Sequence, residues 1–256
     1  SKMFQIYEQI KRIAQSKASV LIQGESGTGK ELVARAIHFH SHRCEKPFIR
    51  VNCAALAETL LESELFGHER GAYTGAISKH VGRFELANEG TLLLDEISEI
   101  SPNIQAKLLR VIEEEEFERV GGEKTIKMDV RIVATTNRNL MEEIHKGTFR
   151  EDLFYRLNVV PIYLPPLRER REDISLLVDY YLKKYSLEND GIVKLIDKEA
   201  MDYLSQYNWP GNVRELKNVI QRAVVMGSSE VLQIEQFTSL FILQDMKRSD
   251  TTLTAG

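Results

Sequence analysis

The stretch Gly24-Glu25-Ser26-Gly27-Thr28-Gly29-Lys30-Glu31 decides the fold of this chain. It follows an apolar run at 18–22 and precedes a helical pattern whose apolar members are Leu32, Val33, Ala36 and Ile37. Glycines let a turn aim several backbone N–H groups at one anion, and a lysine adds charge for the β- and γ-phosphates of a nucleotide. The order of strand, loop and helix predicts a phosphate-binding loop of the Walker A kind. A glycine-rich turn without a ligand is the alternative.

Glu31 departs from the general form of this loop. That form has Ser or Thr after the lysine, which places a hydroxyl on Mg²⁺. With Glu31 in that place, the inner ligands of the metal stay unassigned.

Composition limits the classes of function. The 256 residues include 43% hydrophobic and 28% charged side chains, with a net charge of −4, which argues against a broad nucleic-acid footprint. No apolar run reaches the roughly 20 residues that span a bilayer, so we expect no membrane segment. Cys44 and Cys53 are too few for a disulfide framework, although a bond between them is the alternative, and a reducing cytoplasm is the simplest setting. The chain begins inside a helical pattern, which favours a module of a longer protein.

Short apolar runs alternate with helical patterns over the first part of the chain. The runs that we predict as strands are 18–22, 48–51, 91–95, 130–136 and 159–163. This alternation predicts an α/β fold with a parallel five-stranded sheet flanked by helices. Because Pro161 cannot donate to a strand ladder, the last strand is expected at the edge.

A smaller all-α unit is predicted after the Pro165-Pro166 break. Helical spacing returns from Asp173, again from Asp197, and a third time after Trp209-Pro210-Gly211, where Asn212 and Glu215 have capping-box spacing. We therefore divide the chain into an α/β nucleotide-binding subdomain at 1–168, a helical lid subdomain at 169–244 and a polar tail at 245–256.

Two carboxylates end the predicted strand at 91–95. Asp95 is our candidate Mg²⁺ ligand, direct or through water, and Glu96 is our candidate base for an attacking water. An acidic pair that caps a helix is the alternative. Other polar groups are expected beside these carboxylates because they also end strands: Asn52, Thr136 and Asn137.

Three arginines are candidates for neutralising phosphate charge. Arg150 and Arg156 lie six residues apart, so they cannot share one helix face. Salt bridges with Glu151 and Asp152 are the alternative for them. Arg214 begins the third lid helix, at the end where a helix dipole favours anions, and a surface ion pair is its alternative.

An unusual glycine-bracketed segment occupies residues 71–76. Its residues are Gly71, Ala72, Tyr73, Thr74, Gly75 and Ala76. An exposed aromatic and a threonine between glycines suit a mobile loop that contacts a partner better than they suit a core. Gly121-Gly122 further along predicts a hairpin.

Taken together, these segments resemble the central AAA+ domain of the NtrC-like activators of sigma-54 RNA polymerase. The likeness runs from about residue 2 to residue 240. Residues 71–76 match the family's GAFTGA loop with Tyr73 in place of Phe. The other matching stretches are Gly24–Glu31, Leu94–Ile97, Phe149–Leu153, Leu164–Arg170 and Trp209–Leu216. In this family Glu31 is the usual residue after the lysine, whereas Asn139 stands where Asp is expected.

The resemblance implies a cytoplasmic bacterial ATPase that uses ATP and Mg²⁺ and forms a hexameric or heptameric ring. It implies that Arg150 and Arg156 act on the nucleotide of the next subunit, that Arg214 and Thr136-Asn137 are sensors, and that Asn52 holds Glu96 in an inactive pose. It further implies that residues 71–76 contact sigma-54 and remodel the closed promoter complex into an open one, within transcription activation of the two-component kind. Promoter DNA would be bound by a C-terminal helix-turn-helix outside these residues.

Two other functions stay open from the sequence. An AAA+ machine with a different client, such as an unfoldase or a DNA loader, would have the same motor residues and differ only at 71–76. A nucleotide-gated binding module that recruits polymerase without turnover is the second, and the presence of Asp95, Glu96, Arg150 and Arg156 speaks against it.

Overall fold

The computed structural model describes residues 2–73, 75–189, 194–227 and 229–238. The chain forms two compact units. The sheet unit contains Met3–Glu25 and Gly29–Leu164, and the helical unit contains the chain from Pro165 onward together with Lys2 and Ser26–Thr28. The predicted tail at 245–256 lies outside the described residues.

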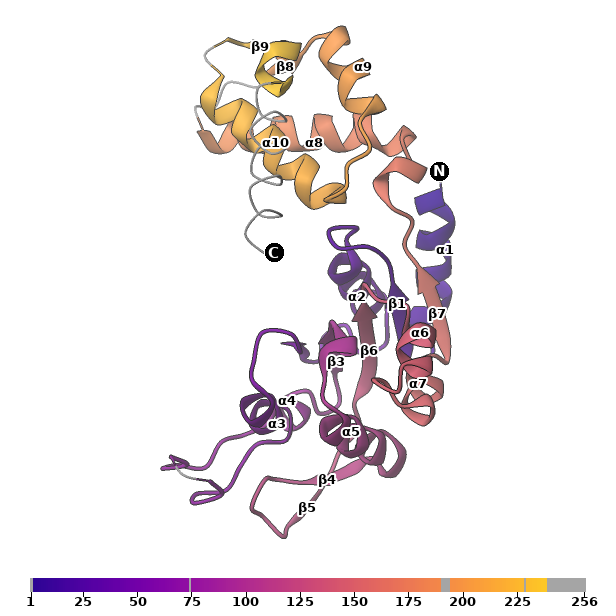
Figure 1. The fold of residues 1–256 in the computed structure, drawn as a ribbon, viewed down its shortest axis with the longest axis vertical. Coiled ribbons are helices and arrows are strands. Elements are labelled where there is room, and N and C mark those ends of the chain that lie inside the picture. The colour runs from indigo at the N-terminus through magenta and orange to yellow at the C-terminus, as the bar shows by residue number, and fades with distance from the viewer. Residues whose placement is uncertain (1, 74, 190–193, 228, 239–256) are drawn as a thin grey trace. The chain divides into compact units, whose positions relative to one another are not determined.

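Five parallel strands form the centre of the sheet unit, in the order β2-β3-β6-β1-β7 (Figure 1). Their bounds are β1 Val20–Gln23, β2 Phe48–Asn52, β3 Thr91–Asp95, β6 Arg131–Thr136 and β7 Val160–Tyr163. The predicted parallel sheet is confirmed. The strand with Pro161 lies at the edge, as its missing N–H donor requires.

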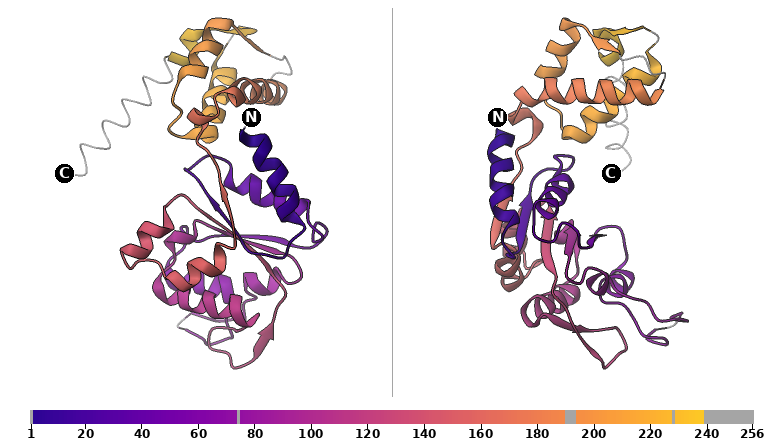
Figure 2. Two further views of the ribbon diagram at one scale, coloured as in Figure 1. Left: turned by 90° about the vertical axis from the view of Figure 1, so that its right-hand side faces the viewer. Right: turned by 180° about the vertical axis from the view of Figure 1, so that it is seen from behind.

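Helices cover both faces of this sheet (Figure 2). The helices of the unit are α1 Lys2–Ala14, α2 Lys30–Phe39, α3 Glu58–Phe66, α4 Arg83–Leu86, α5 Pro102–Glu114, α6 Leu140–His145 and α7 Glu151–Leu157, with a 3₁₀ turn η1 at Ile97–Glu99. Val20 and Ile22 pack in the cluster with α1 and α2, whereas Leu21 packs in the cluster with α3 to α7. Side chains alternate across a strand, so one apolar run supplies both layers of core.

A long loop and a hairpin extend from the sheet unit (Figure 1). The loop joins α3 to α4, and its ends are paired because His68 and His80 exchange backbone hydrogen bonds of 3.1 and 2.9 Å. The hairpin pairs β4 Glu116–Glu118 with β5 Thr125–Lys127 in antiparallel fashion. This confirms the hairpin predicted at Gly121-Gly122.

The helical unit contains α8 Glu172–Asn189, α9 Lys198–Gln206 and α10 Asn212–Met226, with a 3₁₀ turn η2 at Leu167–Glu169. The predicted helices are confirmed, and the Asp197 side chain caps α9 by accepting from Ala200 N. The prediction that this unit contains no strands was wrong, because β8 Leu195–Ile196 pairs with β9 Val231–Leu232. These two-residue strands are too short to give a period-2 pattern in the sequence.

The predicted capping box at the start of α10 is half correct. Glu215 Oε2 accepts from Gly211 N at 2.7 Å, but the N-cap of α10 is Gly211 and not Asn212. Asn212 Oδ1 instead accepts from Leu167 N at 2.8 Å. The buried turn at Leu167 needed an acceptor, and this tertiary bond replaced the local one.

None of the described helices is both long and apolar enough to cross a bilayer.

Arg131 fastens α1 to the sheet. Its side chain is 2% exposed and donates to the carbonyls of Ala14 and Ile13 at 2.8 and 2.7 Å, where α1 ends. Burial, with a smaller effect of Arg43, lowers the pKa of Arg131 to about 10. The cation satisfies carbonyls that a helix end leaves without partners.

We expect Arg131→Met to lower the free energy of unfolding by about 1.5–3 kcal/mol, the usual contribution of hydrogen bonds from a charged group. Urea denaturation measures the loss. Arg12→Met is the matched control, because Arg12 is exposed in the last turn of the same helix. Equal effects of the two variants would contradict the role given to Arg131.

Candidate functional site

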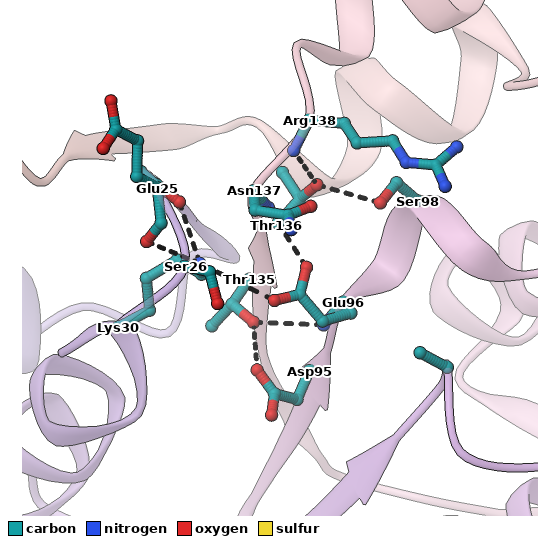
Figure 3. A network of polar contacts seen from close by, with 12 residues as sticks. Glu25, Ser26, Lys30, Asp95, Glu96, Ser98, Thr135, Thr136, Asn137 and Arg138 are labelled. Atoms are coloured by element: carbon teal, nitrogen blue, oxygen red, sulfur yellow. Dashed lines mark hydrogen bonds and ion pairs between the residues drawn. The ribbon is translucent and has the colours of Figure 1, made fainter. Parts of the chain in front are cut away.

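The carboxyl ends of β1, β6 and β3 bring the predicted polar residues to one edge of the sheet. These strands are direct neighbours in that order, so Gly24, Thr136 and Asp95 follow or end adjacent strands. Figure 3 shows Lys30, Glu96 and Thr135 turned toward one another at this edge. Ligands of open α/β sheets bind outside the carboxyl ends of the strands.

Lys30 is the central charge of the site. Its side chain is 6% exposed, and its Nζ donates to the carbonyls of Gly24 and Glu25 at 2.8 and 3.2 Å. Glu96 Oε1 lies 3.7 Å from the same Nζ. Gly29, just before α2, has a φ of 102°, which a side chain rarely adopts. The backbone of the loop therefore folds over the Lys30 ammonium, and two of its carbonyl oxygens accept hydrogen bonds from it.

Glu96 is held in a left-handed backbone conformation. Its φ of 56° and ψ of 54° end β3 abruptly and begin η1. Its N–H donates to Thr135 Oγ1 at 3.2 Å, and its Oε2 accepts from Asn137 N at 3.1 Å. Such a conformation costs on the order of 1–3 kcal/mol in a residue other than glycine, so its surroundings must fix it. These contacts point the carboxylate at Lys30.

Thr135 joins both candidate carboxylates, and sequence reasoning missed it. Its Oγ1 donates to Asp95 Oδ1 at 2.6 Å while accepting from Glu96 N. The predicted neighbour Thr136 bonds elsewhere, because its Oγ1 donates to Ser98 Oγ at 3.0 Å. The available signal was the Thr135-Thr136 pair at the end of a strand, where only one of two adjacent side chains can face the carboxylates.

Arg50 is a second residue that sequence reasoning missed. From the middle of β2, its Nη2 contacts Asp95 Oδ2 at 2.6 Å and its Nη1 contacts Glu31 Oε2 at 2.7 Å. Glu31 also pairs with Arg35, one turn along α2. Glu31, the residue that departs from the general loop pattern, is therefore linked to Asp95 through the Arg50 guanidinium.

Asn52 lies opposite Asp95 in the strand register. Its Oδ1 accepts from Ala54 N at 2.9 Å. Among the hydrogen bonds of the described residues none joins Asn52 to Glu96, whose carboxylate contacts Lys30 and Asn137. The holding role of Asn52 stays a prediction.

Arg150 carries a local ion pair, the alternative that the sequence left open, whereas the acidic partner of Arg156 comes from α5 and is neither Glu151 nor Asp152. Arg150 contacts Asp152 at 2.7 Å, and Arg156 Nε lies 3.6 Å from Glu113. Both side chains are about half exposed. Of the ion pairs that the structure describes, none joins either arginine to Asp95 or Glu96. A surface arginine of this kind can reach a group outside its own unit.

Arg214 lies in the first turn of α10, as predicted. Within the helical unit, its Nη1 donates to Ser26 Oγ at 2.8 Å. Its predicted alternative, a surface ion pair, is not among the contacts that the structure describes for this residue. Its role as a sensor stays a prediction.

Residues 71–76 form a tight loop whose Thr74 lies outside the described residues. Gly71 N donates to Ala76 O at 2.9 Å, which closes the segment. Tyr73 is 41% exposed, and its ring meets His68 edge-on with centroids 5.1 Å apart. His68 Nδ1 lies 2.7 Å from Ser63 Oγ, and its Nε2 lies 3.0 Å from the Ser78 carbonyl. The exposed Tyr73 side chain therefore packs against a histidine whose two ring nitrogens both have polar partners.

The donor set suits Mg²⁺ better than an ion that needs a protein cage. The described residues contain no group of three or more histidines, cysteines and acids that could hold a metal. Mg²⁺ usually takes one or two carboxylates, phosphate oxygens and waters. Each oxygen of Asp95 accepts one bond in the structure and has a lone pair left for a metal or its water.

Cys53 is buried beside the carboxylates and should be inert. It is 2% exposed, and burial raises the pKa of its thiol to about 12, with smaller contributions from Asp95 and Glu96. Cys44 is partly exposed, and neither cysteine is in a disulfide.

We expect Ellman's reagent to modify Cys44 in the folded chain and both thiols after denaturation, because the thiolate is the reactive form. Cys44→Ser should abolish labelling of the folded chain. Fast labelling of Cys53 at neutral pH would contradict its burial.

The raised pKa of Cys53 also predicts how stability depends on pH. The free energy of unfolding should fall as the pH rises from 9.0, the ordinary pKa of a thiol, toward about 12, because only the unfolded state then releases the proton.

Two family models match the chain. A "Sigma-54 interaction domain" matches residues 1–163, and an "AAA+ ATPase lid domain" matches residues 168–253. Regulatory protein AtoC of Escherichia coli strain K12 is 62% identical over 230 residues, which are 90% of this chain and 50% of that protein. The Nif-specific regulatory protein of Azospirillum lipoferum is 58% identical over 236 residues, 92% of this chain and 38% of that protein.

Solved structures agree with the fold. NtrX from Brucella abortus, crystallised in complex with ADP, superposes with a TM-score of 0.85 at 42% identity, covering 92% of this chain and 52% of that one. Hsp104 in its closed state shares the fold, with a TM-score of 0.62 at 22% identity. The chain spans about half the length of AtoC and NtrX.

The matching model covers more than half of the chain, and its relatives carry regulatory names. The chain therefore belongs to the sigma-54 interaction domain family, and its sheet unit is followed by an AAA+ ATPase lid domain.

Proposed function

We propose that this chain hydrolyses ATP and uses the energy to move the 71–76 loop against sigma-54, which remodels the closed promoter complex into an open one. The observation that carries the proposal is the 3.7 Å approach of Lys30 to Glu96 at the phosphate-binding loop. There a cation for phosphate and a carboxylate for water lie in direct contact. The complexes of NtrX with ADP and with ATP support nucleotide binding by this fold.

Each residue of the site has a defined task in this proposal. Lys30 leaves Glu96 and binds the β- and γ-phosphates, which frees the carboxylate to orient and deprotonate water. Thr135 keeps Asp95 and the backbone of Glu96 in place through its hydroxyl. Mg²⁺, when bound, would be held through Asp95 and would neutralise phosphate charge.

Arginines complete the site between subunits of a ring, in this proposal. Arg150, the N-cap of α7, and Arg156, within α7, are each about half exposed, and their acidic partners in the described contacts are Asp152 and Glu113. A partner's arginine finger is worth roughly 10³–10⁵ in rate. Hydrolysis that depends on neighbours requires self-association, into a hexamer or a heptamer. Arg214, Thr136 and Asn137 would report the state of the nucleotide.

The 71–76 loop distinguishes sigma-54 from another client. The Tyr73 ring packs edge-on against His68, and its side chain is 41% exposed. The family model that matches this region is named for sigma-54 interaction. Promoter DNA would be bound by other segments of the full-length protein, since net charge here is −4.

We expect Glu96→Ala to lower phosphate release by about 10²–10⁴-fold, the contribution of a positioned general base. Binding of a fluorescent ATP analogue should persist, because the variant removes no group that contacts phosphate. Wild-type turnover per subunit should rise with protein concentration if neighbours supply arginines. Turnover that survives in Glu96→Ala would exclude this carboxylate as the base, and a fully active monomer would exclude the ring.

Tyr73→Ala should weaken capture of sigma-54 in the presence of ADP and aluminium fluoride while phosphate release stays at the wild-type level. Loss of an aromatic anchor typically costs about 2 kcal/mol or more, or roughly 30-fold in affinity. Tyr180→Ala is the matched control, because this tyrosine of α8 is 60% exposed. Unchanged capture by Tyr73→Ala would favour a different client or contact.

A further inference from the structure

Gln105 is a buried polar residue that the site described so far does not use. It lies in α5, is 0% exposed, and has a partner for each end of its amide. Its Nε2 donates to the carbonyls of Ile100 and Thr148 at 3.0 and 2.9 Å. Its Oε1 accepts from Arg150 N at 2.8 Å. A buried amide with three good bonds is a rigid joint between the segments that it touches.

One end of this joint fixes the backbone of Arg150. The Thr148 carbonyl and the Arg150 N–H flank Phe149, whose ring is 3% exposed in the core. The Gln105 amide therefore pairs with both neighbours of Phe149, much as an adjacent strand would. Arg150 is the N-cap of α7, so its position sets where the helix begins and where the guanidinium starts.

The other end of the joint holds the segment that leaves Glu96. Ile100 follows η1, which begins directly after Glu96, and its carbonyl accepts from the same Nε2. Ser98 in η1 accepts from Thr136 Oγ1 at the end of β6. A shift of Glu96 and η1 would thus move the Ile100 carbonyl and change its hydrogen bond with the Gln105 amide.

We propose that Gln105 is a positioning residue that holds Arg150 in place and couples it to the segment after Glu96. This inference rests on the proposed function, in which Arg150 acts on the nucleotide of a neighbouring subunit. Through Gln105, a subunit's own candidate base and the arginine that it offers to its neighbour belong to one connected unit.

An apolar residue of similar length would fill the space without making the bonds. Methionine in place of Gln105 would leave the buried Ile100 carbonyl and the partly buried Thr148 carbonyl and Arg150 N–H without these bonds. The local backbone would then rearrange to reach water or another acceptor. Because the guanidinium sits at the end of a long side chain, a small backbone shift is enlarged at its tip.

The test compares Gln105→Met, Arg150→Ala and the double variant by steady-state ATP hydrolysis, at a protein concentration that saturates self-association. Gln105→Met should lower kcat by about 10- to 100-fold with KM for ATP within about 2-fold, as expected when a transition-state group is misplaced. In the Arg150→Ala background, the same substitution should change kcat by less than about 2-fold, because the group through which it acts is gone.

Leu108→Ala is the matched control for lost stability. Leu108 is 0% exposed in the same helix and packs in the core. It should lower the melting temperature and leave kcat unchanged when measured below that temperature. Gln105→Asn, one methylene shorter, is the second variant in case Gln105→Met does not fold, and it should lower kcat in the same direction.

The outcomes separate the two ideas. Unchanged kcat in Arg150→Ala would overturn the proposed finger and with it the reason for positioning it. A large effect of Arg150→Ala without one of Gln105→Met and Gln105→Asn would overturn only the role of Gln105. Additive losses in the double variant would also overturn it, because Gln105 would then act independently of Arg150.

Discussion

The buried ammonium of Lys30 is the constraint on which the rest of the site depends. A cation that is 6% exposed is tolerated only with compensation, and here two loop carbonyls and the Glu96 carboxylate provide it. Those partners are the groups that a polyphosphate would displace or extend. The chain thus keeps the Lys30 charge neutralised by its own carboxylate, and in the proposed function ligand binding would exchange one anion for another.

Glu96 connects this charge to the backbone. Its left-handed conformation is maintained by Thr135 and Asn137, both from the end of β6. The carboxylate's direction is therefore fixed by a neighbouring strand and not by its own. Local strain of this sort is affordable only where a sheet holds the surrounding atoms still.

The sequence was sufficient for features that are encoded locally. The phosphate-binding loop, the carboxylates after β3 and the edge strand with Pro161 follow from residue types over short windows, and the sheet confirms the strands. The partners Thr135, Arg50 and Gln105 were missed, because each makes a contact with a residue at least 39 positions away. Such contacts depend on which strands and helices are neighbours. The strand order, with β6 between β1 and β3, is not written in any one segment.

That strand order has a geometric consequence. Adjacent strands lie about 4.8 Å apart, so the two-strand step from β1 to β3 separates the backbones that carry the loop and the carboxylates by about 10 Å. The intervening strand acts as a spacer, which the Lys30 and Glu96 side chains bridge from its two sides, with Nζ and Oε1 3.7 Å apart. In the proposed function, a terminal phosphate and the attacking water would enter where these two groups meet.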